Sequence, residues 1–215
     1  MYSKYDITTA KWGEVKEMGH YDMAILPWGA TEPHNFHLPY CTDMLTAQAV
    51  AFEVAEKAAM QGVNLMVLPG IPLGSQNPGQ IELPYCIHTS QTTQMAILRD
   101  VVRSLKRQGI RKLMIMSGHG GNNFKGIIRD IMIEDPEMII VHNEWFAIIP
   151  RTDYFEEKED DHAGELETSV MLHYYPDLVR MDLAGDGQFS KFGIEGLNKK
   201  VAWLPRDWSK VTQDT

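Results

Sequence analysis

Two short polar segments of this chain hold residue types that bind divalent metal ions. The first contains Glu32 and His34, with Asp43 shortly after them, and the second is a glycine-rich turn around His119. Each segment directly follows an apolar run of the kind that forms a buried strand. Carboxylate oxygens and imidazole nitrogens bind Zn²⁺, Mn²⁺ and similar ions and leave positions open for water. One such residue alone is usually only solvated, but two clusters at one end of a sheet together favour a metal site.

Stretches typical of strands and helices alternate along the chain. Strands are predicted at residues 23–27, 64–69, 112–117 and 138–142, and helices at residues 45–61, 92–108, 123–134 and 164–175. Such alternation builds a mostly parallel sheet, because each helix carries the chain back to the start of the next strand. We therefore predict an α/β fold with three α/β/α layers, in which residues 1–215 form a single domain. Both polar segments then lie at the carboxyl ends of strands, where parallel sheets bind ligands.

The composition narrows the class of partner. The chain has a formal net charge of −9, which opposes binding to nucleic acid or to an anionic membrane surface. Small molecules or other proteins remain as partners. The sequence has neither an apolar run long enough to span a membrane nor a signal-peptide core, so a cytoplasmic location is expected. Cys41 and Cys86 do not form a disulfide framework and are expected to be reduced thiols.

The glycine-rich turn also has an alternative interpretation as a phosphate-binding loop. A strand followed by a glycine turn and a helix aims backbone amides at anions. However, Asn123 stands where the dinucleotide-binding fingerprint needs its third glycine, and no Lys-Ser or Lys-Thr pair follows. Nucleotide binding therefore stays open only as a minor alternative.

Four sequence segments together resemble the signatures of the creatininase (creatinine amidohydrolase) family. They are residues 26–39 (LPWGATEPHNFHLP), the Thr42-Asp43 pair, residues 118–122 (GHGGN) and residues 162–169 (HAGELETS). The resemblance implies an α/β/α fold, homo-oligomers that are often hexamers, and a site for two divalent ions. Zinc is the first expectation, with manganese or Fe²⁺ as other options. By motif position, Glu32 and His119 would hold one ion and His34 the other, with Asp43 bridging them.

One ligand of the family's second ion has no direct counterpart here. Creatininase proper has a glutamate two residues after the motif histidine, where this chain has Gly121. Relatives with the GHGGN form also carry the HAGE sequence, so the resemblance implies that Glu165 supplies this ligand. A competing interpretation makes Glu165 a residue that only stabilises the start of a helix. Glu167 is assigned that structural role alone.

His162 matches the catalytic histidine of the family. Two adjacent metal ions can share a hydroxide, because coordination lowers the pKa of water towards neutrality, and this hydroxide would attack an amide carbonyl. Imidazole side chains commonly transfer protons in catalysis, so His162 could pass a proton to the departing nitrogen. Its alternative interpretation is a surface histidine beside the acidic residues 153–161, which themselves predict a solvated loop or a mobile flap.

The expected function is hydrolysis of the C–N bond of a small cyclic (creatinine-like) amide, a formamide or a related substrate. Creatininase proper covers its ligand with a flap tryptophan, but this chain has Lys158 and Glu159 in that stretch. This departure argues against creatinine itself, and other family branches act on formamides or small peptides. The alternatives are a non-catalytic metal- or nucleotide-binding protein on the same scaffold and a purely structural interaction protein.

Overall fold

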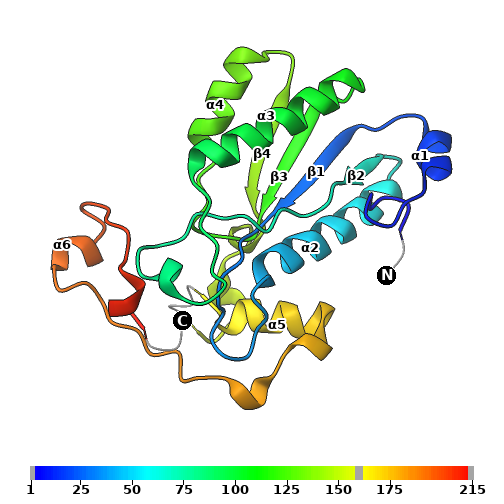
Figure 1. Cartoon of the computed structure of the whole chain (residues 1–215). Coiled ribbons are helices and arrows are strands. Elements are labelled where there is room, and N and C mark those ends of the chain that lie inside the picture. The colour runs from blue at the N-terminus through cyan, green and yellow to red at the C-terminus, as the bar shows by residue number, and fades with distance from the viewer. Residues whose placement is uncertain (1–2, 158–161, 213–215) are drawn as a thin grey trace.

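A parallel four-stranded sheet forms the centre of the molecule. The computed structural model describes residues 3–157 and 162–212. The strands are β1 (Met23–Trp28), β2 (Leu65–Val67), β3 (Lys112–Ser117) and β4 (Ile139–Glu144), and their order in the sheet is β2-β1-β3-β4. All three neighbouring pairs run parallel. In Figure 1 the arrowheads of β1, β3 and β4 converge near the middle of the molecule, so their following loops meet there.

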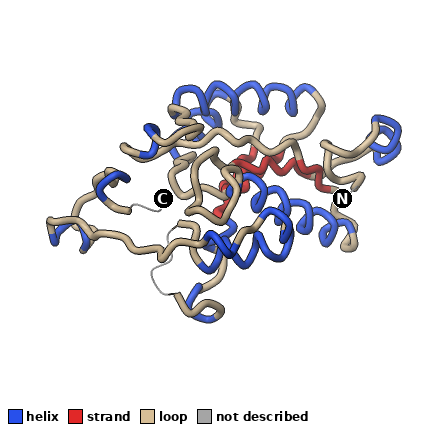
Figure 2. The backbone as a smooth tube through the Cα atoms, turned by 60° about the horizontal axis from the view of Figure 1, so that its bottom comes forward, coloured by secondary structure: helices blue, strands red, loops and turns tan. Residues whose placement is uncertain are grey.

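Helices cover both faces of this sheet. Helix α2 (Thr42–Ala59) packs on one face, whereas α3 (Gln91–Arg107) and α4 (Lys125–Glu134) pack on the other. Figure 2 shows the strands enclosed between these two layers. Strand β1 contributes to both cores through its alternating side chains, since Leu26 faces α3 and α4 while Ile25 faces α2. The predicted three-layer α/β/α fold is confirmed.

The order of the strands explains where a ligand site can form. From β1 the chain passes through α2 to β2 on one side, and from β2 it crosses through α3 to β3 on the other side of β1. Right-handed crossovers in opposite directions place their helices on opposite faces. The carboxyl ends of β1 and β3 therefore bound the crevice at which open parallel sheets bind ligands.

The remaining elements lie around this body. Helix α5 (Glu165–Tyr174) packs against α2, α1 (Trp12–Met18) precedes β1, and the short α6 (Glu195–Asn198) belongs to a long C-terminal segment. Short 3-10 turns are η1 (Gln80–Glu82), η2 (Trp145–Ala147), η3 (Arg151–Asp153), η4 (Pro176–Leu178), η5 (Met181–Leu183) and η6 (Trp208–Lys210). Within the described residues, no helix combines the length and apolar character that a membrane crossing requires.

Predicted and observed elements differ in a few details that matter for the site. Helix α2 begins at Thr42, before the predicted start at residue 45, so Asp43 belongs to its first turn. The predicted long loop at residues 70–85 is present, apart from the short turn η1. Residues 158–161 of the acidic stretch, and with them much of the predicted flap, lie outside the described residues. Cys41 and Cys86 are free thiols.

Candidate metal centre

Buried carboxylates and imidazoles meet at the carboxyl ends of β1 and β3. Nδ1 of His119 lies 2.9 Å from Oε1 of Glu32 and 3.1 Å from Oδ2 of Asp43. Nε2 of His34 lies 2.8 Å from Oδ1 of the same aspartate. The two oxygens of Asp43 therefore face two different imidazoles, so this carboxylate could contact two ions at once. The structure thus brings together Glu32, His34, Asp43 and His119.

Two glycines bring the start of α2 into this cluster. A Cβ atom at Gly29 would lie 2.2 Å from the backbone nitrogen of Met44, and one at Gly118 would lie 2.1 Å from the carbonyl oxygen of Asp43. Contacts this short exclude any side chain at either position. The ends of β1 and β3 consequently pack directly on the backbone of α2, and this packing holds Asp43 between them.

Two further side chains extend the cluster. Oε2 of Glu167, in the first turn of α5, lies 3.9 Å from Nε2 of His34. Nδ1 of His162 lies 3.9 Å from Oε1 of Glu32, and its ring stacks at 4.3 Å from that of His34. Ligand atoms lie within 4.8 Å of one another in three overlapping groups: Glu32, Asp43 and His119; His34, Asp43 and Glu167; Glu32, His34 and His162.

Each of the three imidazoles is oriented by a backbone carbonyl. His34 donates from Nδ1 to the carbonyl of Glu32 at 3.1 Å, and His119 donates from Nε2 to the carbonyl of Ser75 at 2.8 Å. His162 donates from Nε2 to the carbonyl of Pro33 at 2.8 Å. In each ring the other nitrogen is left facing the carboxylates. Metal-binding histidines have this arrangement, in which the outer N–H is bonded and the inner nitrogen is available to the ion.

The electrostatic field of the cluster favours positive charge. Burial alone would lower the pKa of His34, but attraction to Asp43 outweighs it and raises the pKa to about 10. Burial also opposes charge on His119, yet Glu32 and Asp43 raise its pKa well above the usual value. Burial raises the pKa of the Glu167 carboxyl, against the attraction of His34. Carboxylates that stabilise protonated imidazoles this strongly would also stabilise divalent cations. Both the donor types and the field of this cluster therefore fit a metal centre.

One residue of the predicted ligand set lies away from the cluster in the structure. Among the described residues, the ligand groups do not include Glu165. Its carboxylate instead accepts hydrogen bonds from the backbone N–H groups of Glu156 and Glu157, at 2.8 and 2.9 Å. Oε2 of Glu167, which is expected to stabilise the start of the helix, accepts from the backbone N–H of Ala163 at 2.6 Å and also faces Nε2 of His34 at 3.9 Å. The two glutamates point to different sides of α5, because neighbours two apart on a helix are nearly opposite.

A further residue of the site comes from the long loop, which carries no metal-binding motif. Gln80 is buried in η1, and its Nε2 donates to Oε2 of Glu32 at 2.6 Å. Its own Oε1 accepts from the backbone N–H of Asn77. The amide of Gln80 thereby fixes the Glu32 carboxylate with its other oxygen directed at His119. Only the functional potential of a long loop pointed to this segment in the sequence.

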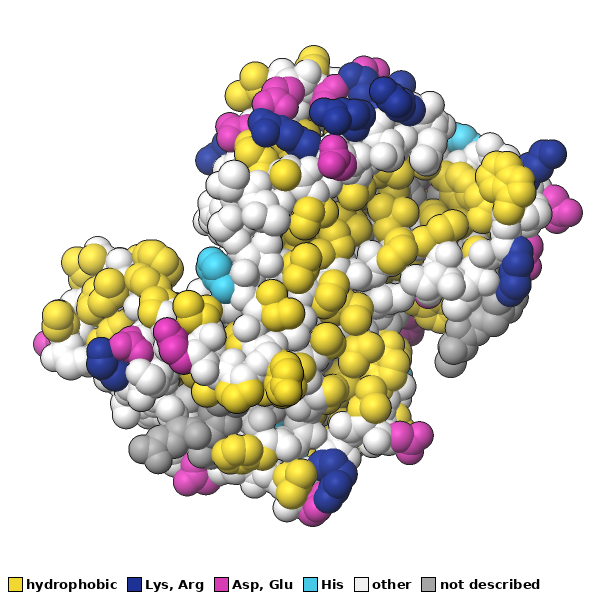
Figure 3. Space-filling model, viewed as in Figure 1, with side chains coloured by type: hydrophobic (Ala, Val, Ile, Leu, Met, Phe, Trp, Pro, Cys, Tyr) yellow, Lys and Arg dark blue, Asp and Glu magenta, His cyan; other side chains and the backbone are white. Residues whose placement is uncertain are grey.

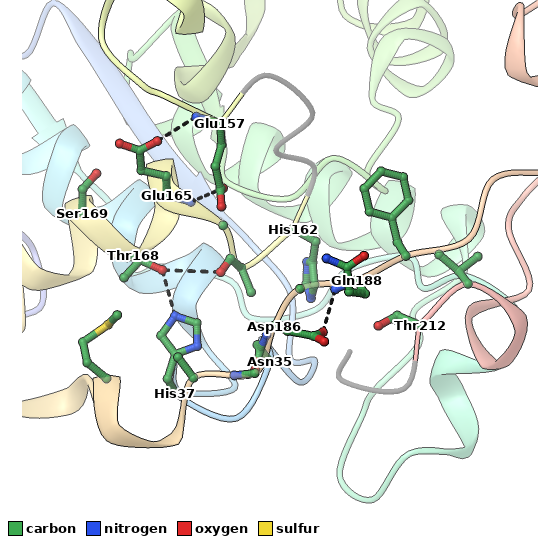
Figure 4. Close-up of a pocket in the computed structure, with 18 of the residues that line it drawn as sticks. Asn35, His37, Glu157, His162, Glu165, Thr168, Ser169, Asp186, Gln188 and Thr212 are labelled. Carbon is green, nitrogen blue, oxygen red and sulfur yellow. Dashed lines mark hydrogen bonds between the residues drawn. The ribbon is translucent and has the colours of Figure 1, made fainter.

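A cavity of about 630 Å³ opens beside His162. It lies between α5 and the C-terminal segment, and its walls include His37, Thr168 and Trp208. Figure 4 shows His162 at the edge of this cavity, with His37 hydrogen-bonded to Thr168. This volume falls in the range of cavities that bind small organic molecules. His162 thus has the cavity on one side and the carboxylate cluster on the other.

Known proteins share this sequence and this fold. The chain is 30% identical over 181 residues to a creatinine amidohydrolase of Pseudomonas putida, covering 75% of this chain and 68% of that protein. It is 26% identical over 200 residues to a 3-dehydro-scyllo-inosose hydrolase of Thermotoga maritima, covering 85% of this chain and 62% of that protein. The chain thus spans 68% of the first of these curated relatives and 62% of the second.

A solved structure matches over the whole chain. The crystal structure of a Bacteroides fragilis protein, described as a candidate creatinine amidohydrolase, superposes with a TM-score of 0.97 at 55% identity. The match covers 100% of this chain and 85% of that chain. The family model described as creatinine amidohydrolase matches residues 8–215, which include every residue of the carboxylate and imidazole cluster. The chain therefore belongs to the creatininase family.

Proposed function

We propose that this protein is a metal-dependent amidohydrolase with two metal ions, which hydrolyses the C–N bond of a small cyclic amide, a formamide or a related substrate. The observation that carries the proposal is Asp43, whose two oxygens face His34 and His119 on opposite sides. A single shared carboxylate between two ligand groups serves a pair of ions better than one ion. Family membership supports hydrolysis as the reaction, since the matched relatives are hydrolases.

The three groups of ligand atoms suggest which residues would hold each of the two proposed ions. Glu32, Asp43 and His119 would hold one ion, and His34, Asp43 and Glu167 the other. We propose zinc for both positions, with manganese as an alternative, because mixed oxygen and nitrogen donors suit either metal. Solved creatininases of 25% and 26% identity include a mutant of Zn-Zn type and a manganese form. When bound, the two ions would supply a water of lowered pKa and polarise the carbonyl of the substrate.

His162 would act as the general base and general acid in this reaction. Because its Nε2 donates to the carbonyl of Pro33, the neutral ring carries its lone pair on Nδ1, the atom that faces Glu32. Nδ1 can accept a proton from the attacking water and return it to the departing nitrogen, which is too basic to leave as an anion. The ring of His34 on one side and the carbonyl of Pro33 on the other hold this imidazole in place.

The cavity beside His162 would hold the remainder of the substrate. It offers amide and hydroxyl groups from Asn35, Thr168 and Gln188, together with apolar surface from Leu172 and Phe189. At about 630 Å³ it has room for substrates larger than a single five-membered ring. We therefore favour an amide with a polar substituent over creatinine itself.

We further propose that the chain forms homo-oligomers, with the hexamer of the resembled family as the expected state. The C-terminal segment exposes several large apolar side chains, namely Ile194, Val201, Trp203 and Leu204. Figure 3, viewed as in Figure 1, shows hydrophobic side chains gathered on the lobe that projects at the left, where Figure 1 places α6. Grouped exposed apolar side chains commonly mark contacts with another protein. Light scattering coupled to size exclusion would measure the assembly.

A direct assay tests the proposed activity. The purified protein, reconstituted with zinc or manganese, is expected to bind two equivalents of metal and to release amine or ammonia from at least one compound in a panel of formamides, cyclic amides and short peptides. Two bound ions without turnover of any amide would favour the non-catalytic metal-binding protein. A failure to bind stoichiometric metal would exclude both the hydrolase and the metal-binding alternative.

A pair of substitutions in α5 tests which glutamate serves the second ion. Glu167→Gln is expected to lose one of the two ions and to reduce hydrolysis about 100-fold, since charge stabilisation by one ion contributes several kcal/mol. Glu165→Gln is the matched control for metal content, because its carboxylate accepts hydrogen bonds from backbone N–H groups of the preceding loop. Elemental analysis and initial rates provide the measurement. Equal metal content in the two variants would refute the assignment of Glu167.

A further inference from the structure

Trp208 is an isolated buried side chain in an otherwise exposed segment. Among the described residues from Leu172 to Thr212, it alone is buried, with 8% of its surface exposed. It begins the short turn η6, far in sequence from every residue of the carboxylate cluster. A large aromatic side chain held this way in an extended segment must have specific neighbours, and they belong to two different parts of the site.

The first neighbour is His162. The indole of Trp208 meets the imidazole edge to face, with ring centroids 5.3 Å apart and an interplanar angle of 85°. His34 stacks on the same imidazole at 4.3 Å, so His162 lies between two aromatic rings. Edge-to-face pairs of this kind have a preferred geometry and stabilise it. Without Trp208, the contact that holds His162 from the side of the C-terminal segment would be lost.

The second neighbour is the loop that carries Gln80. The backbone N–H of Trp208 donates to the carbonyl of Pro78 at 2.7 Å. At Gly79, where φ is +84°, a Cβ atom would lie 2.8 Å from both Oδ1 of Asp207 and the backbone nitrogen of Ser209. The loop and the C-terminal segment are therefore in direct backbone contact. The next residue is Gln80, which holds the Glu32 carboxylate at 2.6 Å.

We propose that Trp208 is a positioning residue that completes the site from the C-terminal segment, holding His162 through its ring and the Gln80–Glu32 pair through its backbone. This inference rests on the proposed function for the role of His162, but its second part concerns metal binding alone. The segment thus links the group that moves the proton to a carboxylate that binds metal. Both would be misplaced together if the segment moved away.

Substitutions at Trp208 test the inference in the full-length, zinc-loaded protein. Trp208→Ala is expected to lower kcat about 100-fold, since small misplacements of catalytic groups cost that much. It should also weaken zinc binding about tenfold, because the segment whose backbone bonds to Pro78 loses the buried side chain that anchors it. Trp208→Phe keeps an aromatic ring against His162 and a buried anchor for the segment, and should restore both values to within about threefold. Trp12→Ala, which removes an exposed indole of α1, is the control and should change neither value.

Gly79→Ala separates the two parts of the proposal, which are the ring contact with His162 and the loop contact that supports Glu32. It remains informative if Trp208→Ala fails to fold. The nearest atoms to its Cβ would be Oδ1 of Asp207 and the backbone nitrogens of Ser209 and Trp208, at 2.8 to 3.0 Å, so it would push the Gln80 turn away from the C-terminal segment. We expect zinc affinity, measured by chelator competition without substrate, to fall about tenfold while kcat at saturating zinc stays within about threefold. Unchanged zinc affinity in Gly79→Ala would refute the proposed role of the loop contact in supporting Glu32. Normal kcat in folded Trp208→Ala, or failure of Trp208→Phe to restore it, would refute the proposed role of the Trp208 ring in holding His162.

The two proposals can fail separately in these measurements. If the unaltered protein hydrolyses no amide, the proposed function is refuted. The zinc affinities of the variants still show whether the loop contact supports Glu32. If hydrolysis is found and the variants behave like the unaltered protein, the proposed function stands and Trp208 has no positioning role.

Discussion

Replacing Asp43 with Asn is expected to release both metal ions and to lower hydrolysis by on the order of 10³-fold. Each oxygen of this carboxylate faces a different imidazole, so both ions lose a charged ligand at once. Asparagine has nearly the same volume, and the packing of Gly29 and Gly118 on the adjacent backbone is unaffected. Elemental analysis of the purified variant and initial rates at saturating substrate would measure the two effects.

The control for this substitution is Asp100→Asn on α3. Its carboxylate is exposed and pairs only at the surface with Arg103, so neither metal content nor rate should change. An Asp43→Asn protein that retained one full equivalent of zinc would show that Asp43 serves a single ion. Retention of two equivalents would refute the dinuclear arrangement as proposed.

Replacing His162 with Ala is expected to lower kcat by about 10² to 10⁴-fold, which is the usual contribution of a general acid–base group. Metal content should stay at two equivalents, because the proposed ligand sets do not need this imidazole. The comparison of kcat with metal stoichiometry is therefore the informative measurement. His20→Ala provides the control, since that imidazole is largely exposed and pairs only with Asp22.

The same experiment can reveal a different role for His162. Its Nδ1 belongs to a group with Glu32 and His34 that could hold an ion. Loss of one equivalent of zinc in His162→Ala would make it a ligand and leave the proton transfer to another group. Unchanged kcat would exclude both roles.

Much of the architecture could be predicted from local sequence patterns. The apolar runs predicted as strands at residues 23–27 and 112–117 are strands in the structure, and the polar segments after them meet as expected. This prediction works because strand length and alternation with helices determine where the carboxyl ends lie. It fails at boundaries such as the start of α2, because the N-cap Cys41 makes no side-chain capping bond that would mark it.

The sequence itself contains a reason why Glu167, rather than the expected Glu165, lies beside His34. On a helix, Glu167 shares a face with Met171, one turn later, and Met171 is completely buried. Glu165 instead shares a face with the polar Ser169, which is exposed. The helical spacing of apolar residues in α5 therefore indicates that Glu167 faces inward, whereas motif matching alone favoured Glu165.

Gln80 and Trp208 could not have been found in the same way. Neither lies in a periodic element, and both reach the site through contacts between segments far apart in the sequence, such as the bond from Gln80 to Glu32 and the bond from Trp208 to Pro78. Hydrophobic periodicity reports on local structure, so it contains no information about these pairings. Only the folded chain shows that a loop amide and a C-terminal indole support the cluster.

The carbonyls that orient His34, His119 and His162 have an evolutionary consequence. A substitution replaces a side chain but leaves the main-chain oxygen in place, so mutations nearby cannot readily turn these rings away from the carboxylates. The walls of the cavity, by contrast, consist largely of replaceable side chains. A lineage built on this scaffold can exchange one substrate for another while inheriting its chemistry unchanged, in keeping with relatives as different as a creatinine amidohydrolase and a 3-dehydro-scyllo-inosose hydrolase.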